Sequence, residues 1–284
     1  MSRAFRQVDV FTDAPYLGNP VAVVLGADEV ETAAMTRFTR WTNLSEAAFV
    51  LSPRNPAADY RLRIFTSAPR TGARNTGELP FAGHPTLGGC HAWLEAGGVP
   101  RREDRIVQEC GAGLISIRRD DATLAFAAPP LVRSGPVERG LLERIAGMLG
   151  LDPGEIVDAA WVDNGPGWVG VLLASAEAVL ALQPGRVELE VGVAGPYPAG
   201  ARQAFEVRAF IPGHGAAVED PVTGSLNAGL AQWLLASGRA RAPYTASQGT
   251  VLGRRGRVEI SRDAEGTIWV GGGTVTCIRG EVEL

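Results

Sequence analysis

Short apolar stretches separated by turn signals make up most of the chain, which is the pattern of β-strands. The stretches are rich in β-branched and aromatic residues, and 36 glycines and 19 prolines punctuate them. Strands are predicted over residues 6–11, 20–25, 48–51, 60–65, 114–118, 168–173, 204–210, 257–260 and 267–270. Helical periodicity occurs in fewer places, over residues 31–41, 85–95, 140–149 and 225–236. Many strands and few helices favour an α+β fold over a doubly wound sheet.

Two of the predicted helices, 85–95 and 225–236, resemble each other. At an offset of 140 residues Trp93 matches Trp233 and Gly98 matches Gly238. Both helices are apolar nearly all round, so both should be buried. We therefore expect two similar domains, each with a sheet wrapped around a central helix. The predicted domains are 1–115 and 116–273, with the last strand, 274–284, returning to the first.

The charge of the chain argues against two classes of partner. Its 284 residues carry a net charge of −4, which provides no attraction to nucleic acid or to anionic lipid. No apolar run is long enough to span a bilayer, and the first residues have the pattern of a strand rather than of a signal peptide. We expect a cytoplasmic protein that binds neither nucleic acid nor membranes.

The cysteine and lysine content of the chain excludes several kinds of site and cofactor. Cys90, Cys110 and Cys277 are widely spaced and odd in number, which argues against a disulfide framework or a zinc site and favours a reducing compartment. The chain contains no lysine. A pyridoxal-phosphate Schiff base, a lysine-dependent aldolase and a P-loop each need lysine, so these three classes are excluded.

The starts of the two matching helices are candidate anion sites. A helix N-terminus carries partial positive charge and unsatisfied N–H groups, which favour a bound carboxylate. If the two halves face each other, both starts would converge on one substrate and stabilise an enolate-like charge. Simple capping by Thr223 and Ser225 is the alternative. The candidate binding residues are Gly83, Pro85, Thr86, Thr223, Gly224 and Ser225. Pro85 is expected at the first helical position.

His84 is the candidate titrating group at the first helix start. The helix dipole would favour its neutral form, which can donate or accept a proton near pH 7. A metal site is not expected, because His84 and His91 lie about 10.5 Å apart along a helix axis and have no further ligands nearby. A structural capping role for His84 remains open, and His91 and His214 are expected to be structural or exposed.

Two carboxylates are candidates for acid/base chemistry. Glu46 stands at the entry of an apolar strand, where burial would raise its pKa toward the working range of a general base. The alternative is an exposed charge on an edge strand. Asp220 lies just before the second helix and is either a partner of the helix dipole or the second carboxylate of a pair. Glu78 and Glu219 are expected to be exposed.

Six segments, taken together, resemble the phenazine-biosynthesis isomerase (PhzF-like) family. They occur in the family's order and span nearly the whole chain. The segments are GNPVAVV (18–24), NLSEAAFV (43–50), ELPFAGHPTLG (78–88), EDPVTGS (219–225), SQGTVLGR (247–254) and VGGGTVTCIRGE (270–281). Taken alone, the glycines at 271–273 are expected to form a turn or bulge ahead of a strand.

The resemblance implies a fold similar to diaminopimelate epimerase. That fold has two pseudo-symmetric α+β domains, each a curved, mostly antiparallel sheet around a central helix, with the site between them. It also implies a homodimeric isomerase that needs neither metal nor organic cofactor. In the characterised phenazine member, a glutamate shuttles a proton on a dihydro-hydroxyanthranilate ring.

The residues of this chain can be matched to those roles. Glu46 matches the proton-shuttling glutamate, while His84, Asp220 and Ser225 match its polar partners. We therefore expect an isomerase that moves a proton on a small carboxylate. The expected substrates include cyclic acids that carry an amino or a hydroxyl group. One departure from the family pattern is a polar stretch over residues 67–77, which puts the identity of the substrate in doubt.

Two rival functions remain. A racemase or epimerase on the same fold would use one thiol at the start of each central helix, where this chain has His84 and Ser225. A non-catalytic protein would keep the site to bind a small acid or a protein partner. Thiol alkylation tests the first rival, and solvent deuterium exchange into a bound acid tests the second.

Overall fold

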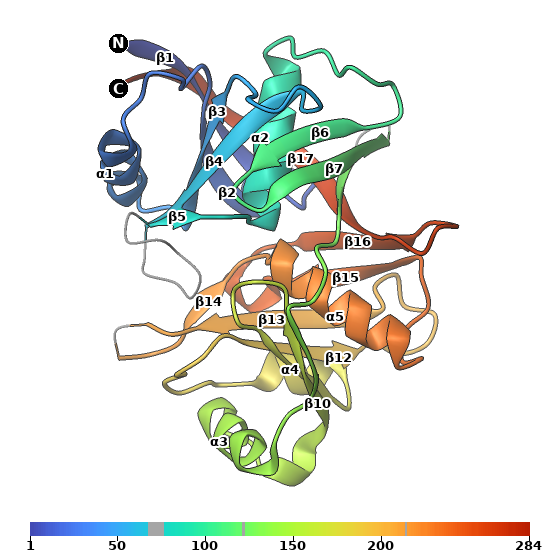
Figure 1. The fold of residues 1–284 in the computed structure, drawn as a ribbon. Coiled ribbons are helices and arrows are strands. Elements are labelled where there is room, and N and C mark those ends of the chain that lie inside the picture. The colour runs from blue at the N-terminus through green and yellow to red at the C-terminus, as the bar shows by residue number, and fades with distance from the viewer. Residues whose placement is uncertain (68–76, 121–122, 214) are drawn as a thin grey trace. The chain divides into compact units, whose positions relative to one another are not determined.

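The computed structural model describes residues 1–67, 77–120, 123–213 and 215–284, and most of its regular structure is β-strand (Figure 1). The chain divides into two compact units. The first contains residues 1–127 and 271–284, and the second contains residues 128–270. Within the described ranges, no helix is both long enough and apolar enough to cross a bilayer.

The first unit is a closed ring of strands. Going round it, the order is β17, β1, β2, β3, β4, β6, β7 and β8, and β8 pairs again with β17. The β2–β3 and β4–β6 pairs are parallel, and the short β5 pairs antiparallel with β4. The bounds are β1 Ser2–Val10, β2 Asn19–Val24, β3 Glu46–Leu51, β4 Tyr60–Thr66, β5 Glu78–Leu79, β6 Ile106–Cys110, β7 Gly113–Asp120, β8 Thr123–Ala127 and β17 Ile268–Glu283.

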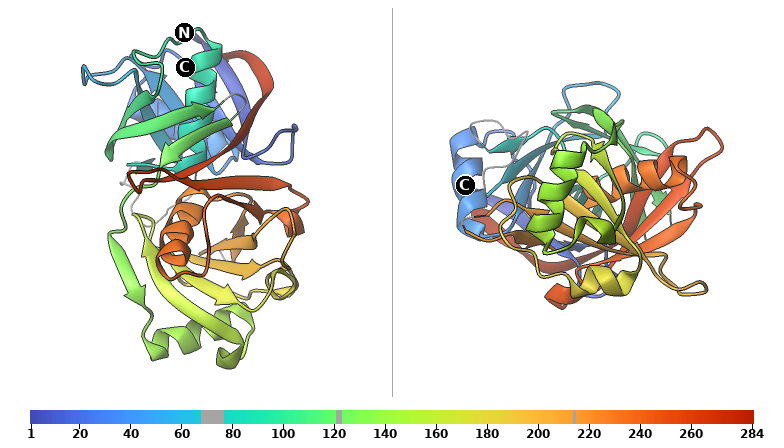
Figure 2. Two further views of the ribbon diagram at one scale, coloured as in Figure 1. Left: turned by 90° about the vertical axis from the view of Figure 1, so that its right-hand side faces the viewer. Right: turned by 90° about the horizontal axis from the view of Figure 1, so that it is seen from below.

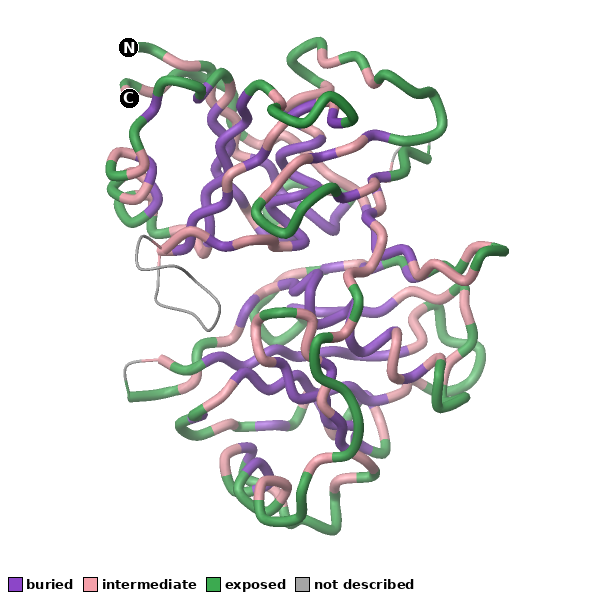
Figure 3. Tube along the Cα trace, in the orientation of Figure 1, coloured by how far each residue is buried: buried purple, intermediate pink, exposed green. Residues whose placement is uncertain are grey.

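Helix α2 (Gly83–Glu95) is the buried helix of this unit and packs against β1, β2, β3, β4 and β8. Glycines make this close packing possible. A Cβ atom at Gly88 would lie 2.4 Å from Val21 Cγ1, and one at Gly89 would lie 2.7 Å from Leu62 Cδ1. Helix α1 (Thr32–Thr42) connects β2 to β3 and packs against β3 and β4. Figure 3 shows the buried backbone of α2 and of its surrounding strands.

The second unit has strands in the order β9, β10, β11, β12, β13, β15 and β16, with the short β14 paired antiparallel to β13. The β11–β12 and β13–β15 pairs are parallel. The bounds are β9 Arg133–Pro136, β10 Ile156–Asp163, β11 Val169–Leu173, β12 Val191–Pro196, β13 Phe205–Ile211, β14 Val218–Asp220, β15 Tyr244–Gln248 and β16 Gly256–Arg262.

Helix α5 (Gly224–Ala236) is the buried helix of the second unit and packs against β10, β11 and β16. Helix α4 (Ala176–Ala181) connects β11 to β12, and α3 (Arg139–Leu149) precedes β10. Two 3-10 turns, η1 (Pro153–Glu155) and η2 (Thr250–Leu252), complete the unit. Figure 2 shows both buried helices from further directions.

The observed division differs from the predicted boundaries at 115 and 273. The first unit continues to Ala127 because β7 and β8 form a hairpin and β8 closes the ring onto β17. Of the turn or bulge expected at glycines 271–273, the turn is wrong, since all three lie inside β17. A Cβ atom at Gly271 would lie 2.6 Å from the Leu124 oxygen, and one at Gly273 would lie 2.5 Å from the Thr12 oxygen. These glycines therefore permit close backbone approach within the sheet.

Candidate active site

The first unit brings Glu46 and His84 together. Glu46 is the first residue of β3 and is fully buried, so it is not an exposed edge charge. His84 is the second residue of α2 and is 4% exposed. Glu46 Oε2 lies 3.4 Å from His84 Nε2. Because burial of a lone charge is costly, a carboxylate beside an imidazole here marks a candidate acid/base pair.

Asn19 defines which nitrogen of His84 carries the proton. Asn19 is the first residue of β2, is 1% exposed, and places its side-chain nitrogen 3.4 Å from His84 Nδ1. An amide nitrogen can only donate, so Nδ1 accepts and the proton of a neutral imidazole lies on Nε2. That proton faces the Glu46 carboxylate. The arrangement runs from Asn19 through His84 to Glu46.

The backbone turn before Asn19 is held by Asp9. The Gly18 amide donates to Asp9 Oδ2 at 3.0 Å, and Asp9 is 1% exposed. A Cβ atom at Gly18 would lie 2.2 Å from the Val10 oxygen, so only glycine fits there. This contact explains why the motif at 18–24 begins with glycine.

The other residues predicted at the first helix start have different surroundings. Gly83 is the first residue of α2, and Pro85 is the third rather than the first, a position in the first turn where proline is still tolerated. Thr86 is fully buried, and its hydroxyl accepts a hydrogen bond from Gln108 Nε2 at 3.2 Å. Gln108 in turn accepts from the Tyr60 hydroxyl. The Thr86 side chain therefore belongs to an interior network.

The second unit gathers Asp220, Thr223 and Gln248 at the start of α5. Asp220 ends β14, is 4% exposed, and accepts a 2.6 Å hydrogen bond from the Thr223 hydroxyl. Gln248 accepts from the Thr223 amide at 3.0 Å and donates to the Thr223 hydroxyl at 3.0 Å. Asn227 Nδ2 also donates to Gln248 at 2.8 Å. This network holds the chain immediately before Gly224, the first residue of α5.

Ser225 lies in the same helix start but has other partners. Its hydroxyl accepts from Trp168 Nε1 at 3.0 Å, and its carbonyl accepts from Asn164 Nδ2 at 2.8 Å. Neither Thr223 nor Ser225 caps α5 through its side chain, since no side-chain cap bond forms there. The capping alternative considered for these two residues is therefore wrong.

Each unit also has an arginine–glutamate pair beside its central helix. Arg63 binds Glu78 through Nε and Nη2, at 2.8 and 2.9 Å, and Arg208 binds Glu219 in the same way, at 3.0 and 2.7 Å. The side chains of Glu78 and Glu219 are 16% and 11% exposed, so the expectation that both are exposed is wrong. Bidentate pairing allows these charges to leave bulk water.

Sequence reasoning did not single out Asn19, Gln248 or Trp168. Asn19 lies in the motif at 18–24 and Gln248 in the motif at 247–254, so both were within the segments that carry the resemblance. Trp168 carries no such signal. His214 and residues 68–76, the main part of the polar stretch at 67–77, lie outside the described residues. Across the part of the chain that the structure describes, no three His, Cys, Asp or Glu side chains are grouped as metal ligands.

Comparison with known proteins places the chain in a family. The family model described as phenazine biosynthesis-like protein, PhzC-PhzF, matches residues 8–280. The chain is 34% identical over 300 residues to antisense-enhancing sequence 1 of Schizosaccharomyces pombe, covering 98% of each chain. It is also 34% identical over 295 residues to trans-2,3-dihydro-3-hydroxyanthranilate isomerase of Pseudomonas fluorescens, again covering 98% of each.

A solved structure agrees in fold. The phenazine biosynthesis protein of the PhzF family from Bacillus anthracis superposes with a TM-score of 0.81 over 100% of both chains, at 21% identity. The family model extends over nearly the whole chain, and its span includes Asn19, Glu46, His84, Asp220 and Ser225. The chain therefore belongs to the phenazine biosynthesis-like (PhzC-PhzF) family.

Proposed function

We propose that the chain is an isomerase that moves a proton between two carbon atoms of a small carboxylate, with Glu46 as the base and acid. The observation that carries the proposal is the buried Glu46 carboxylate 3.4 Å from His84 Nε2. The name of the Pseudomonas fluorescens relative supports an isomerase and a substrate similar to dihydro-hydroxyanthranilate.

The weak acidity of the substrate's carbon-bound proton determines what the site must provide. A carbon-bound proton beside a conjugated carboxylate is weakly acidic, so its removal needs a positioned base and a stabilised anion. Glu46, as a carboxylate, takes this proton, and the electron pair left on carbon spreads into the conjugated system. Glu46 then returns the same proton to a different carbon. No electrons are gained or lost. The proposed steps use only Glu46, His84 and the backbone N–H groups at the helix starts, with neither a metal nor an organic cofactor.

His84 is proposed to hold Glu46 and the developing charge. Its Nε2 proton faces Glu46, and Asn19 keeps that tautomer in place through Nδ1. A fixed N–H near the reacting carboxylate needs no reorganisation when charge moves, which is the main advantage of a preorganised site.

The substrate carboxylate is proposed to bind at helix starts. Gly83 begins α2, and Gly224 begins α5 behind the Asp220–Thr223–Gln248 network. Backbone N–H groups at helix starts favour an anion. Action of both helix starts, and of Asp220, on one substrate stays a prediction.

We propose further that the two units are copies of one fold. In each, an antiparallel pair leads into a parallel pair (β2–β3 and β11–β12), then an antiparallel pair, a short strand, a buried helix and a second parallel pair. Alignment of Gly83 with Gly224, at an offset of 141 residues, places Glu78 on Glu219 and Pro80 on Pro221, which is one residue out of register with the match of Trp93 to Trp233. The matched arginine–glutamate pairs support the same correspondence, and superposition of the two units tests it.

The test of the mechanism is a pair of glutamine variants. Glu46→Gln should slow turnover by about 10²-fold or more while ligand binding is retained, because general acid/base catalysis contributes about 10²–10⁴-fold. Glu206→Gln is the matched control, since Glu206 is also fully buried and its Tyr197 hydrogen bond can be kept by an amide oxygen. It should turn over like the parent.

Proton exchange in D₂O, followed by NMR, measures both variants. The first substrate to test is trans-2,3-dihydro-3-hydroxyanthranilate, followed by a panel of small cyclic carboxylates. If Glu46→Gln exchanged substrate protons as fast as the parent, Glu46 would not be the base, and His84 or Asp220 would have to take that role.

A second candidate function is non-catalytic binding of a small acid or a protein partner. The name of the Schizosaccharomyces pombe relative states no reaction, which keeps this candidate in view. A binder would hold an acid from the panel without any deuterium entering it. The family resemblance also leads us to propose a cytoplasmic homodimer, which sedimentation of the purified protein tests.

A further inference from the structure

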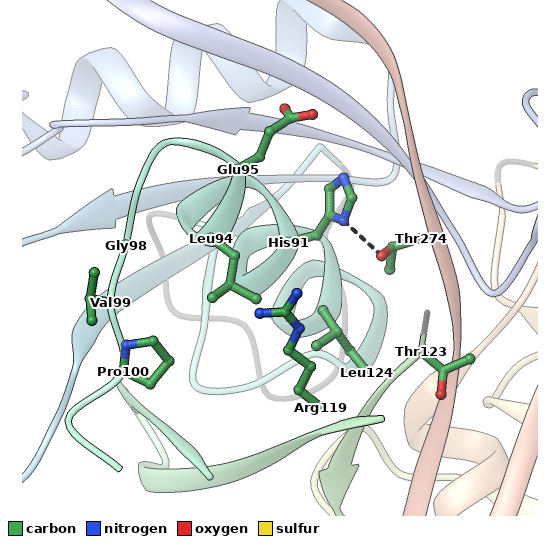
Figure 4. A pocket seen from close by; sticks show the side chains of 10 residues that line it. All are labelled: His91, Leu94, Glu95, Gly98, Val99, Pro100, Arg119, Thr123, Leu124 and Thr274. Carbon is green, nitrogen blue, oxygen red and sulfur yellow. Dashed lines mark hydrogen bonds between the residues drawn. The ribbon is translucent and has the colours of Figure 1, made fainter. Parts of the chain in front are cut away.

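The first unit contains a pocket that the proposed reaction does not use. It has a volume of about 550 Å³ and lies beside the last turns of α2 (Figure 4). Its lining residues come from α2, the loop after it, β7, β8 and β17: His91, Leu94, Glu95, Gly98, Val99, Pro100, Arg119, Thr123, Leu124 and Thr274. His84 lies seven residues before His91 on α2, so the His91 wall of the pocket is about 10.5 Å along the helix axis from His84.

Arg119 is the unusual residue of this pocket. Along β7, Ile115 and Ile117 are buried, and alternation of side chains puts Arg119 on the same face of the strand. Its cross-strand partner is Leu124, which is 5% exposed. Figure 4 draws the Arg119 side chain extending toward the middle of the lining residues. Arg119 itself is exposed, and its side chain extends from the Ile115–Ile117 face of β7 into the pocket.

No carboxylate among the described residues lies within ion-pair distance of Arg119. Glu95 also lines the pocket, but its carboxylate accepts from Arg6 Nε at 2.9 Å and from Arg279. Burial alone would raise the pKa of Glu95, yet the hydrogen bonds from Arg279 and Arg6 bring it below its usual range. Its negative charge is thus neutralised by two other arginines. The guanidinium of Arg119 remains available to an anion.

The rest of the wall supplies apolar contact and fixed polar groups. Leu94, Val99 and Pro100 form an apolar side. His91 Nδ1 and Nε2 lie 2.9 and 2.8 Å from the hydroxyls of Thr274 and Thr276. Burial lowers the pKa of His91, which favours the neutral imidazole. His91 therefore supplies polar atoms to the pocket but not a second positive charge. The pocket therefore combines one cation with apolar surface.

We propose that this pocket is a second binding site, for a small carboxylate with an apolar body, held by the Arg119 guanidinium. Guanidinium and carboxylate match in a planar, two-bond arrangement, and Leu94, Val99 and Pro100 would cover the apolar part of the ligand. The proposal does not depend on the proposed function, because none of its residues belongs to the Glu46–His84 pair.

The test uses benzoate as the probe, titrated into the full-length protein and followed by NMR. Benzoate should shift the backbone signals of His91, Leu94 and Thr274. Arg119→Gln should weaken binding tenfold or more, since hydrogen bonds to a charged group are among the strong ones. Benzamide, which has the same ring without the charge, should bind at least tenfold more weakly.

Arg118→Gln is the matched control, because Arg118 is the neighbouring exposed arginine on the opposite face of β7. It should bind benzoate like the parent. Three results would overturn the proposal: equal affinity in Arg119→Gln and the parent, equal affinity for benzamide, or shifts confined to residues around Glu46 and His84. Turnover is not part of this readout, so failure here leaves the proposed reaction untouched.

Discussion

Several of the buried polar side chains lie at the starts of the two buried helices or next to them. In the first unit Asn19, Glu46 and His84 are nearly inaccessible, and in the second Asp220 and Gln248 are. A buried polar group costs about 1–3 kcal/mol when it lacks a hydrogen-bond partner, so such groups are tolerated mainly where they are paired or where function requires them. Single residues therefore support the proposal that these helix starts form the site.

The three cysteines offer a test at the same scale. Burial raises the pKa of the Cys90 thiol to about 12 and also raises the pKa of Cys110 and Cys277. Since the thiolate is the reactive form, iodoacetamide near pH 7 should leave Cys90 unmodified and turnover unchanged. Mass spectrometry of the treated protein measures the modification. In urea, all three cysteines should react.

Loss of turnover in step with modification of Cys90 would contradict this expectation. It would also revive the two-thiol racemase as a function, although His84 and Ser225 occupy the helix starts where that chemistry needs its thiols.

At the scale of elements, the arginine–glutamate pairs connect strands and helices around each buried helix. Arg63 Nη2 donates to Thr32 Oγ1 at the start of α1 as well as to Glu78 on β5. Arg208 Nη1 donates to the carbonyl oxygens of Val179 and Leu182 at the end of α4. Each arginine also lies over a phenylalanine two residues along its strand, at 5.1 and 4.9 Å from the ring centre. These pairs anchor the short strands that lead into α2 and α5.

Removal of one such pair should be costly. Glu219→Ala leaves the Arg208 guanidinium, whose side chain is 4% exposed, without its carboxylate. Breaking a buried pair in this way typically costs about 3–5 kcal/mol of the free energy of unfolding. Urea denaturation measures the change.

The control for that experiment is Glu143→Ala. Glu143 pairs with Arg139 on the surface of α3, where the two side chains are 52% and 92% exposed. Exposed pairs of this kind contribute about 0–1 kcal/mol. A loss at Glu219 no larger than the loss at Glu143 would show that the buried pair does not anchor β14.

At the scale of the whole molecule, the first unit is discontinuous in sequence. Its ring is completed by β17, whose residues pair with β1 over the register from Ser2–Glu283 to Val10–Thr274. The Met1 amino group also donates to the Leu284 oxygen at 2.9 Å. The first unit therefore cannot complete its sheet until the last residues of the chain are in place.

A chain that ends at Val270 tests this dependence. It lacks residues 271–284, so β1 loses one neighbour and β8 loses its closing strand. Hydrogen exchange should show lost protection over residues 1–127, because unpaired strand edges cannot keep their amides in hydrogen bonds. Protection over residues 128–270 should persist. Full protection of residues 1–127 in the shortened chain would contradict the prediction.

Local features were predictable from the sequence. The helices expected at 31–41, 85–95, 140–149 and 225–236 are observed within two residues, because their apolar spacing is a property of the segment itself. The strands expected at 48–51 and 60–65 are likewise observed within two residues, as β3 and β4. The exposure of Glu78 and Glu219 was not predictable, since it depends on Arg63 and Arg208, which stand on a different strand.

The sequence by itself determined the two buried helices, most of the helix positions and the absence of lysine, and it singled out Glu46, His84 and Asp220 as candidates. These are consequences of local periodicity, composition and motif order. Only the tertiary structure decided that Glu46 is buried beside His84, that Asn19 assigns the proton of that imidazole, and that Thr223 bonds Asp220 instead of capping α5. Each of these contacts except the last joins residues far apart in the chain, and all of them depend on strand register and helix placement, which no local pattern encodes.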